Sequence, residues 1–211
     1  MSDIEPVPAA TVVLVRQSQD APELEVLLLQ RNSRLVFHGG HWVFPGGRID
    51  EKDYQDSAPG LEYPAALRAA VRETKEEAGL DIDADQLIHT AHWTTPPNLP
   101  RRFCTWFFIC PIFEMVSVSV DNDEILDHRW ISPKAAIADA KAKRWVVPRP
   151  TLTTLSDIVG HQNLAELVAV LTVHFQKDTT DNWMTKLMQA GVPAGPVLDV
   201  AQMTSDPQAL A

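Results

Sequence analysis

Cysteine is scarce in this sequence, which limits its disulfide and zinc chemistry. Cys104 and Cys110 are the only two cysteines among 211 residues. Two cysteines cannot form a disulfide framework, and no second pair completes a zinc site. Both lie in one apolar run, where free thiols are usually buried. We therefore expect a reducing, cytoplasmic compartment.

Positive charge is also in short supply. The chain has 18 Lys and Arg against 28 Asp and Glu, a formal net charge of −10. A general nucleic-acid binder needs a basic face to meet phosphates, so this balance argues against a nucleic-acid partner. A small anionic substrate stays open, because a bound divalent cation can invert the local field.

The sequence lacks long hydrophobic runs. No apolar stretch reaches the length that spans a bilayer. Residues 1–10 are acidic and contain proline, without the basic start and apolar core of a signal peptide. We expect neither a membrane partner nor a secretory leader.

What is present is a series of apolar and amphipathic segments separated by turn-forming residues. Strand patterns cover residues 11–16, 23–30, 87–93, 102–112 and 127–131, and helical patterns cover 64–78, 133–143, 151–159 and 164–175. Beyond them, a short amphipathic helix over 182–189 precedes a stretch with two prolines and two glycines. We predict a boundary near Lys177, with a domain over 1–177 and a tail over 178–211.

The most informative stretch is the end of the helix predicted over 64–78, which continues as RETKEEAGL over 72–80. Glu73, Glu76 and Glu77 stand at i, i+3 and i+4, so three carboxylates gather on one side, and we expect them to lie mostly off the apolar, buried stripe of the helix. Oxygen-rich clusters suit Mg²⁺ or Mn²⁺, and Arg72 can pair with Glu76 one turn on. The alternative is a solvated acidic helix face with one ion pair.

A Gly-Gly turn lies upstream, where Gly46 and Gly47 follow a short apolar strand. A carbonyl of either glycine can complete a metal shell. Turn and helix together resemble the signature of Nudix hydrolases: Gly, five residues, Glu, seven residues, then Arg-Glu-apolar-any-Glu-Glu-any-Gly-apolar. The second half is present, with Thr74 where an aliphatic residue is usual. The resemblance covers roughly residues 11–175.

The first half of the signature departs more. Asp53 stands six residues after Gly47, where the family has Glu, and 24 residues separate Gly47 from Arg72 instead of 13. We interpret this difference as an insertion of about 11 residues between the turn and the helix. Glu62 is a candidate for the role of the signature's first Glu.

The resemblance implies an α/β (α+β) Nudix fold, a mixed β-sheet sandwiched between α-helices. It also implies Mg²⁺ or Mn²⁺ held by Glu73, Glu76 and Glu77, which would activate water and neutralise a pyrophosphate. A further acid usually comes from elsewhere in the chain, as general base or extra metal ligand. Among Asp121, Asp123 and Glu124 we favour Glu124, against the alternative of a solvated loop carboxylate.

The substrate expected from the resemblance is coenzyme A or an acyl-CoA. Residues that match the CoA pyrophosphatase branch are Leu27, Leu28, Arg31, Gly40 and Phe44 to Gly47, whereas Leu29, Asn32 and Val36 depart from it. Arg31, Arg34 and Arg48 are the candidate substrate-binding residues, because arginine suits bidentate phosphate contacts.

Other functions stay open. ADP-ribose, NADH, nucleotide sugars, dinucleoside polyphosphates or damaged nucleoside triphosphates are alternative substrates, since a family fold does not fix the substrate. A non-catalytic Nudix-like ligand-binding module is another alternative, although the three glutamates are intact and no basic helix-turn-helix is present. The oligomeric state is also open, with a homodimer as one option.

The tail over 178–211 resembles a short internal piece of family III CoA-transferases, over some 30 residues. A segment of this length is too short to fold or catalyse as that family does. We interpret it as a fused remnant.

Overall fold

The structure is a computed structural model that describes residues 4–34, 39–54, 62–97, 99–120 and 122–176, with side chains up to 171. The chain divides into two units, Met1–Val168 and Ala169–Ala211. The boundary near Lys177 stays a prediction, and the helix expected over 182–189 lies outside the described residues. In the described part of the chain, no helix is long and apolar enough to cross a membrane.

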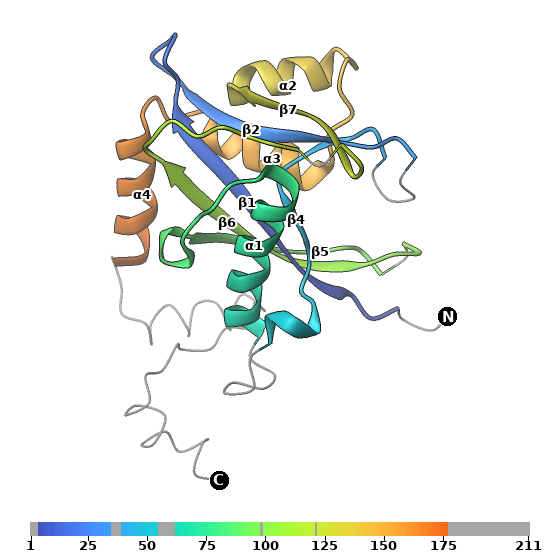
Figure 1. The fold of residues 1–211 in the computed structure, drawn as a ribbon. Helices are drawn as coiled ribbons and strands as arrows, with labels where there is room; N and C mark the ends of the chain where they lie inside the picture. The colour runs from blue at the N-terminus through green and yellow to red at the C-terminus, as the bar shows by residue number, and fades with distance from the viewer. Residues whose placement is uncertain (1–3, 35–38, 55–61, 98, 121, 177–211) are drawn as a thin grey trace, which may run out of the picture. The chain divides into compact units, whose positions relative to one another are not determined.

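A mixed sheet forms the centre of the first unit, with the strand order β3-β2-β1-β6-β5 (Figure 1). The parallel pair β1–β6 lies in its middle, β4 pairs antiparallel with β1, and β7 pairs antiparallel with β2. The strands are β1 Val7–Gln17, β2 Leu24–Arg31, β3 Trp42–Val43, β4 Gly46–Arg48, β5 Ile88–Thr94, β6 Phe103–Ile112 and β7 Ile125–Ile131. Every predicted strand is therefore confirmed. β1 and β7 begin four and two residues earlier than predicted, and the other bounds agree within one residue.

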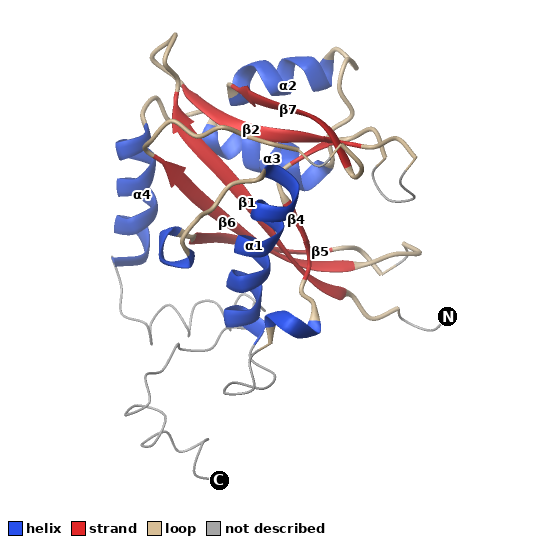
Figure 2. Cartoon of the chain, viewed as in Figure 1, coloured by secondary structure: helices blue, strands red, loops and turns tan. Residues whose placement is uncertain are grey.

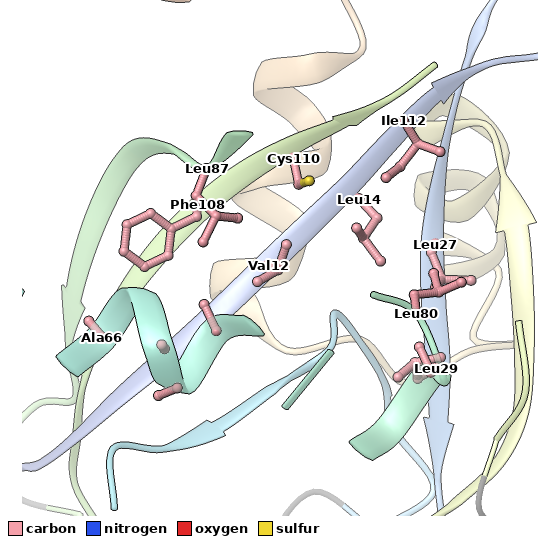
Figure 3. Packing of buried hydrophobic residues seen from close by; sticks show 14 of the residues in the cluster. Val12, Leu14, Leu27, Leu29, Ala66, Leu80, Leu87, Phe108, Cys110 and Ile112 are labelled. Atoms are coloured by element: carbon pink, nitrogen blue, oxygen red, sulfur yellow. The ribbon is translucent and has the colours of Figure 1, made fainter. Parts of the chain in front are cut away.

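Both faces of this sheet are covered. Successive side chains of a strand point to opposite faces, and the four residues of β1 from Val12 to Val15 are all fully buried. Val12 and Leu14 join Phe108 and Cys110 of β6 in the core beneath the first helix (Figure 3). Val13 and Val15 are buried on the other face, which requires a second layer.

The helices supply the two layers. Figure 2 shows α1 in front of the sheet and α3 behind it. Leu155 and Ile158 of α3 are buried, and α2 contacts both α3 and β2. The helices are α1 Glu62–Ala78, α2 Pro133–Lys141, α3 Arg149–Ile158 and α4 Leu164–Gln176, of which α4 crosses the boundary between the units. The expected mixed sheet between helices is confirmed.

Helix α1 packs on the sheet through small side chains. Its fully buried residues near the start are Ala65, Ala66, Ala69 and Ala70. Thr74 is also buried, and its hydroxyl donates to the Ala70 carbonyl at 2.8 Å, so the helix itself satisfies the polar group that replaces the usual aliphatic residue. Gly79 ends the helix at φ 69°, a conformation that favours glycine.

Candidate active site

Glu77 is the most deeply buried acid of the predicted glutamate cluster, with 5% of its surface exposed. The Gly46 N–H donates to its Oε2 at 2.9 Å, and Arg31 Nη1 approaches its Oε1 at 3.4 Å. Burial raises the pKa of Glu77 to about 8. The hydrogen bond from Gly46 and the charge of Arg31 lower this pKa, whereas the charges of Glu73 and Glu124 raise it further. The prediction that the glutamates lie mostly off the buried stripe is therefore wrong for Glu77.

The two glycines of β4 make this approach possible. Gly46 has φ 155°, and a Cβ there would lie 2.7 Å from Thr11 Cα and against the Ala10 carbonyl. A Cβ on Gly47 would overlap the Glu73 carboxylate. Gly46 therefore lets β4 lie close to β1, and Gly47 leaves room for the Glu73 carboxylate beside the backbone of β4.

Arg72 organises the rest of the cluster. Its Nη1 donates to Glu73 at 2.7 Å and to Glu76 at 3.0 Å. Its Nε and Nη2 form a fork with the two carboxylate oxygens of Asp53, at 3.1 and 2.8 Å. The Arg72–Glu76 pairing predicted from the sequence is thus present, within a larger network that also takes in the Arg48 carbonyl, 2.9 Å from Nη2.

Asp53, rather than Glu62, binds Arg72, the arginine of the signature. Asp53 is 4% exposed, and the Asp50 N–H donates to its Oδ2 at 2.8 Å. Burial raises the pKa of Asp53, but the hydrogen bonds and charge of Arg72 outweigh it and lower the pKa overall. Glu62 instead accepts from Trp106 Nε1 at 2.6 Å, at the far end of α1. The extra residues thus enter the chain after the acid, which keeps its place near the Gly-Gly turn.

Glu124 reaches the cluster through the end of β2. The Asn32 N–H donates to the Glu124 carbonyl at 2.7 Å, and Asn32 Nδ2 donates to the Asp123 carbonyl at 2.8 Å. Arg31 Nη2 lies 3.6 Å from Glu124 Oε2, so one guanidinium bridges Glu77 and Glu124. The Glu124 side chain is 57% exposed. Asp121 lies outside the described residues.

Two of the candidate arginines are not drawn into the cluster. The Arg48 side chain is exposed, and only its backbone carbonyl takes part in the network. Arg34 is exposed, and its N–H is bound by Asn32 Oδ1 at 3.1 Å. Within the described part of the chain, no ion pair joins either side chain to the glutamates.

The donor set suits a hard divalent cation in its chemistry. Burial is the largest cause of the raised pKa values of Glu73 and Glu77. A cation beside these carboxylates would offset the free-energy cost of burying their charged form. Among the described residues no three acidic, His or Cys side chains converge as a ready metal cage, and Arg72 donates to both Glu73 and Glu76. A metal-ligand role for the Gly46 carbonyl stays a prediction, since the contact that joins Gly46 to the cluster is its N–H.

Comparison with known families shows which family the chain belongs to. The family described as NUDIX domain matches residues 5–154, well over half of the chain. The chain belongs to the Nudix hydrolase family. A second family, CoA-transferase family III, matches residues 127–211 and overlaps the end of the Nudix match, so that similarity begins well before the expected residue 178.

Two curated relatives of this Nudix chain carry names that specify a substrate. The acyl-coenzyme A diphosphatase NUDT19 of Xenopus laevis is 30% identical over 264 aligned residues, covering 82% of this chain and 69% of the relative. The peroxisomal coenzyme A diphosphatase ndx-8 of Caenorhabditis elegans is 33% identical over 79 residues, covering 37% of this chain and 30% of the relative. The chain spans 56% of the length of another Caenorhabditis elegans relative in the family.

A solved structure confirms the fold. The Nudix hydrolase from Alicyclobacillus acidocaldarius superposes with a TM-score of 0.70 at 22% identity, covering 80% of this chain and 96% of that protein. At this identity the likeness concerns the fold alone.

Proposed function

We propose that this Nudix chain is a metal-dependent hydrolase that cleaves the pyrophosphate bond of a nucleoside diphosphate linked to X, with CoA or an acyl-CoA as the substrate. The observation that carries the proposal is the buried Glu77, held between the Gly46 N–H and Arg31 with its pKa raised to about 8. Burying a carboxylate with so little compensation lowers stability, which makes a cation-binding role its best explanation.

The roles of the residues follow from their contacts. Glu73, Glu76 and Glu77 would hold Mg²⁺ or Mn²⁺, which when bound supplies charge neutralisation and a more acidic water. Arg72 fixes the orientation of Glu73 and Glu76 from a position that Asp53 locks. Glu124, exposed beside Arg31, would take a proton from water as a general base.

Arg31 is the arginine best placed to meet a phosphate. Its Nη1 and Nη2 lie against Glu77 and Glu124, and its buried Nε has no hydrogen-bond partner among the described residues. An anion beside it would satisfy a guanidinium that the carboxylates reach only at 3.4 and 3.6 Å. Arg34 and Arg48 stay candidates for more distant contacts with the substrate.

The CoA assignment is supported by the sequence match over Leu27 to Gly47 and by the substrate names of the Xenopus and Caenorhabditis relatives. In this reaction water attacks the pyrophosphate, one P–O bond breaks, and adenosine 3′,5′-bisphosphate and a 4′-phosphopantetheine compound leave. A cytoplasmic location and the absence of a nucleic-acid partner stay predictions, and a homodimer stays one option.

A substrate screen tests this choice. Wild-type protein with Mg²⁺ or Mn²⁺ is given CoA, acyl-CoA esters, ADP-ribose, NADH and nucleotide sugars, and products are identified by mass. We expect a CoA compound to have the highest kcat/KM. If the kcat/KM of ADP-ribose or NADH exceeds that of every CoA ester by tenfold, about 1.4 kcal/mol, the CoA assignment is wrong. In that case the departures from the CoA signature at Leu29, Asn32 and Val36 were the better guide to the substrate. If no compound is cleaved but one binds, the chain is a binding module.

A pair of variants refines the assignment of the arginines. Arg31→Ala should raise KM more than it lowers kcat if its phosphate contact is the same in substrate and transition state. Arg34→Ala should act in the same direction with a smaller change. Arg144→Ala is the matched control and should leave both constants unchanged, since Arg144 follows α2 in the chain and pairs with Asp139 of that helix.

A further inference from the structure

A second cluster of reactive side chains lies on the same sheet face as α1, around the first turn of that helix. The register of β5 and β6 pairs His92 with Trp106 and Thr94 with Cys104. Directly paired residues share a face of a sheet, so these four side chains form one surface. Glu62, at the start of α1, is bound to it through Trp106.

Cys104 is in contact with a base. Its Sγ lies 3.3 Å from His92 Nε2 and 3.2 Å from Thr94 Oγ1, and the cysteine is half-buried. Cys110, six residues along the same strand, is fully buried, and burial raises the pKa of its thiol to about 12. The chain therefore has one thiol beside an imidazole, Cys104, and one thiol buried in the core, Cys110.

His92 is held in position for this contact. Its ring stacks on Trp106 with centroids 4.2 Å apart and an interplanar angle of 24°. Burial lowers the pKa of His92, against the opposing charge of Glu62, so the ring is neutral at neutral pH. In the tautomer that carries its proton on Nδ1, Nε2 accepts from the thiol. The ring of His89, on the same strand, also contacts Trp106, with the two ring centroids 5.0 Å apart. Burial lowers the pKa of His89 as well.

We propose that Cys104 and His92 form a reactive thiol–imidazole pair that exchanges with small organic disulfides. The Cys104 S–H proton passes to His92 Nε2, and the thiolate sulfur attacks one sulfur of R–S–S–R. The S–S bond of the disulfide breaks, a mixed disulfide forms on Cys104, and the departing R–S⁻ takes the proton from the imidazolium. The Thr94 hydroxyl donates to the thiolate while it exists. Nucleophile, adjacent base and a group that orients the base are the general signature of an activated thiol.

Wild-type protein alone gives the first test. Native chain is mixed with 5,5′-dithiobis(2-nitrobenzoate) at pH 7, release of the aromatic thiolate is followed by absorbance, and the labelled cysteine is located by peptide mass. Because His92 can take the thiol proton during the attack, we expect Cys104 to react roughly tenfold faster than the thiols of the urea-unfolded chain. We expect Cys110 to react only after unfolding.

Variants distinguish activation of Cys104 by His92 from reactivity that is due only to the exposure of the thiol. Cys104→Ser should remove the fast phase and Cys110→Ser should keep it. His92→Gln should slow the fast phase by roughly tenfold, whereas the matched control His89→Gln, whose ring does not contact the sulfur, should leave it unchanged. Circular dichroism of each variant verifies the fold.

Either of two results overturns the proposal: Cys104 in the native chain reacts no faster than in the unfolded chain, or folded His92→Gln reacts at the wild-type rate. Pyrophosphate hydrolysis plays no part in this assay, so its outcome is independent of the proposed function.

Discussion

The two halves of α1 lie on the same sheet and are built for different purposes. In the first half, Ala65, Ala66, Ala69 and Ala70 are fully buried and bring the helix backbone close to the sheet. In the second half, the positions that face β4 hold Glu73 and Glu77, whose pKa values are raised by burial. The first half is buried through alanines alone, whereas the second half buries carboxylates beside Thr74 and Ala78.

The difference shows how one helix separates stability from chemistry. Small residues fill the narrow space over β1 and need no partners. The acids need a glycine edge in β4 to approach it and a rigid arginine to hold them. Mutations in the first half should therefore lower the free energy of unfolding and leave turnover nearly unchanged, whereas mutations of the acids should strongly lower turnover.

The largest effect is expected at the buried acid. Glu77→Gln or Glu76→Gln should lower kcat at saturating Mg²⁺ at least about a thousandfold, roughly 4 kcal/mol, because each removes a hard ligand. Glu73→Gln should also be severe. Lys75→Gln is the control on the same helix, since Lys75 is exposed and pairs with Asp81, and should turn over at the wild-type rate. Full activity in both the Glu76 and Glu77 variants would exclude the mechanism.

The next effect distinguishes the two candidate signature acids. Asp53→Asn should lower the free energy of unfolding by about 3 kcal/mol, because a neutral amide replaces the buried carboxylate that accepts from Nε and Nη2 of Arg72, and should lower kcat. Glu62→Gln should change stability by less than about 1 kcal/mol, since the amide oxygen can still accept from Trp106. Urea unfolding of both variants provides the measurement, and the opposite ranking would return the role to Glu62.

Stability should depend on pH through Glu77. Its pKa is about 8 in the folded chain against 4.5 for the free side chain. The folded chain therefore binds the extra proton between these values, and the free energy of unfolding falls as pH rises through that window. Metal-free wild type should lose on the order of 2 kcal/mol relative to Glu77→Gln between pH 6 and pH 8. Parallel curves for the two proteins would show that Glu77 is ionised at little cost.

Glu124 should have a smaller effect on rate. Glu124→Gln should lower kcat by about tenfold and flatten the acidic limb of the pH–rate profile if Glu124 is the general base. The measurement is kcat against pH at saturating metal, with Asp123→Asn as the neighbouring control. A profile identical to that of the wild type would remove Glu124 from the site.

The smallest effect is expected in the first half of α1. Ala69→Gly should lower the free energy of unfolding by about 1 kcal/mol, because glycine is a poorer helix former and a buried methyl group is lost. The kcat of the folded protein should stay within about twofold of the wild type. A loss of kcat comparable to that of the acid variants would show that the two halves are not separable.

Much of the fold was predictable from periodicity. Alternating or continuous apolar runs bounded by turn residues located the strands, and the three glutamates located the acidic side of α1. The burial of Glu77 was not predictable, because a helical pattern shows which residues share a side but not how closely that side approaches a glycine edge. Asp53 was visible six residues after Gly47, but its role depends on where the extra residues enter the chain. The bridging position of Arg31 depends on strand register and the Asn32 contacts.

The mass of the products formed from CoA tests the central claim most directly. Wild-type protein with Mg²⁺ should convert CoA to adenosine 3′,5′-bisphosphate and 4′-phosphopantetheine, with one ¹⁸O atom incorporated from labelled water. The Glu77→Gln variant, and wild type with a chelator, should yield neither product. Equal product from Glu77→Gln, or from wild type without divalent cations, would contradict a pyrophosphate hydrolase built on the glutamates of α1.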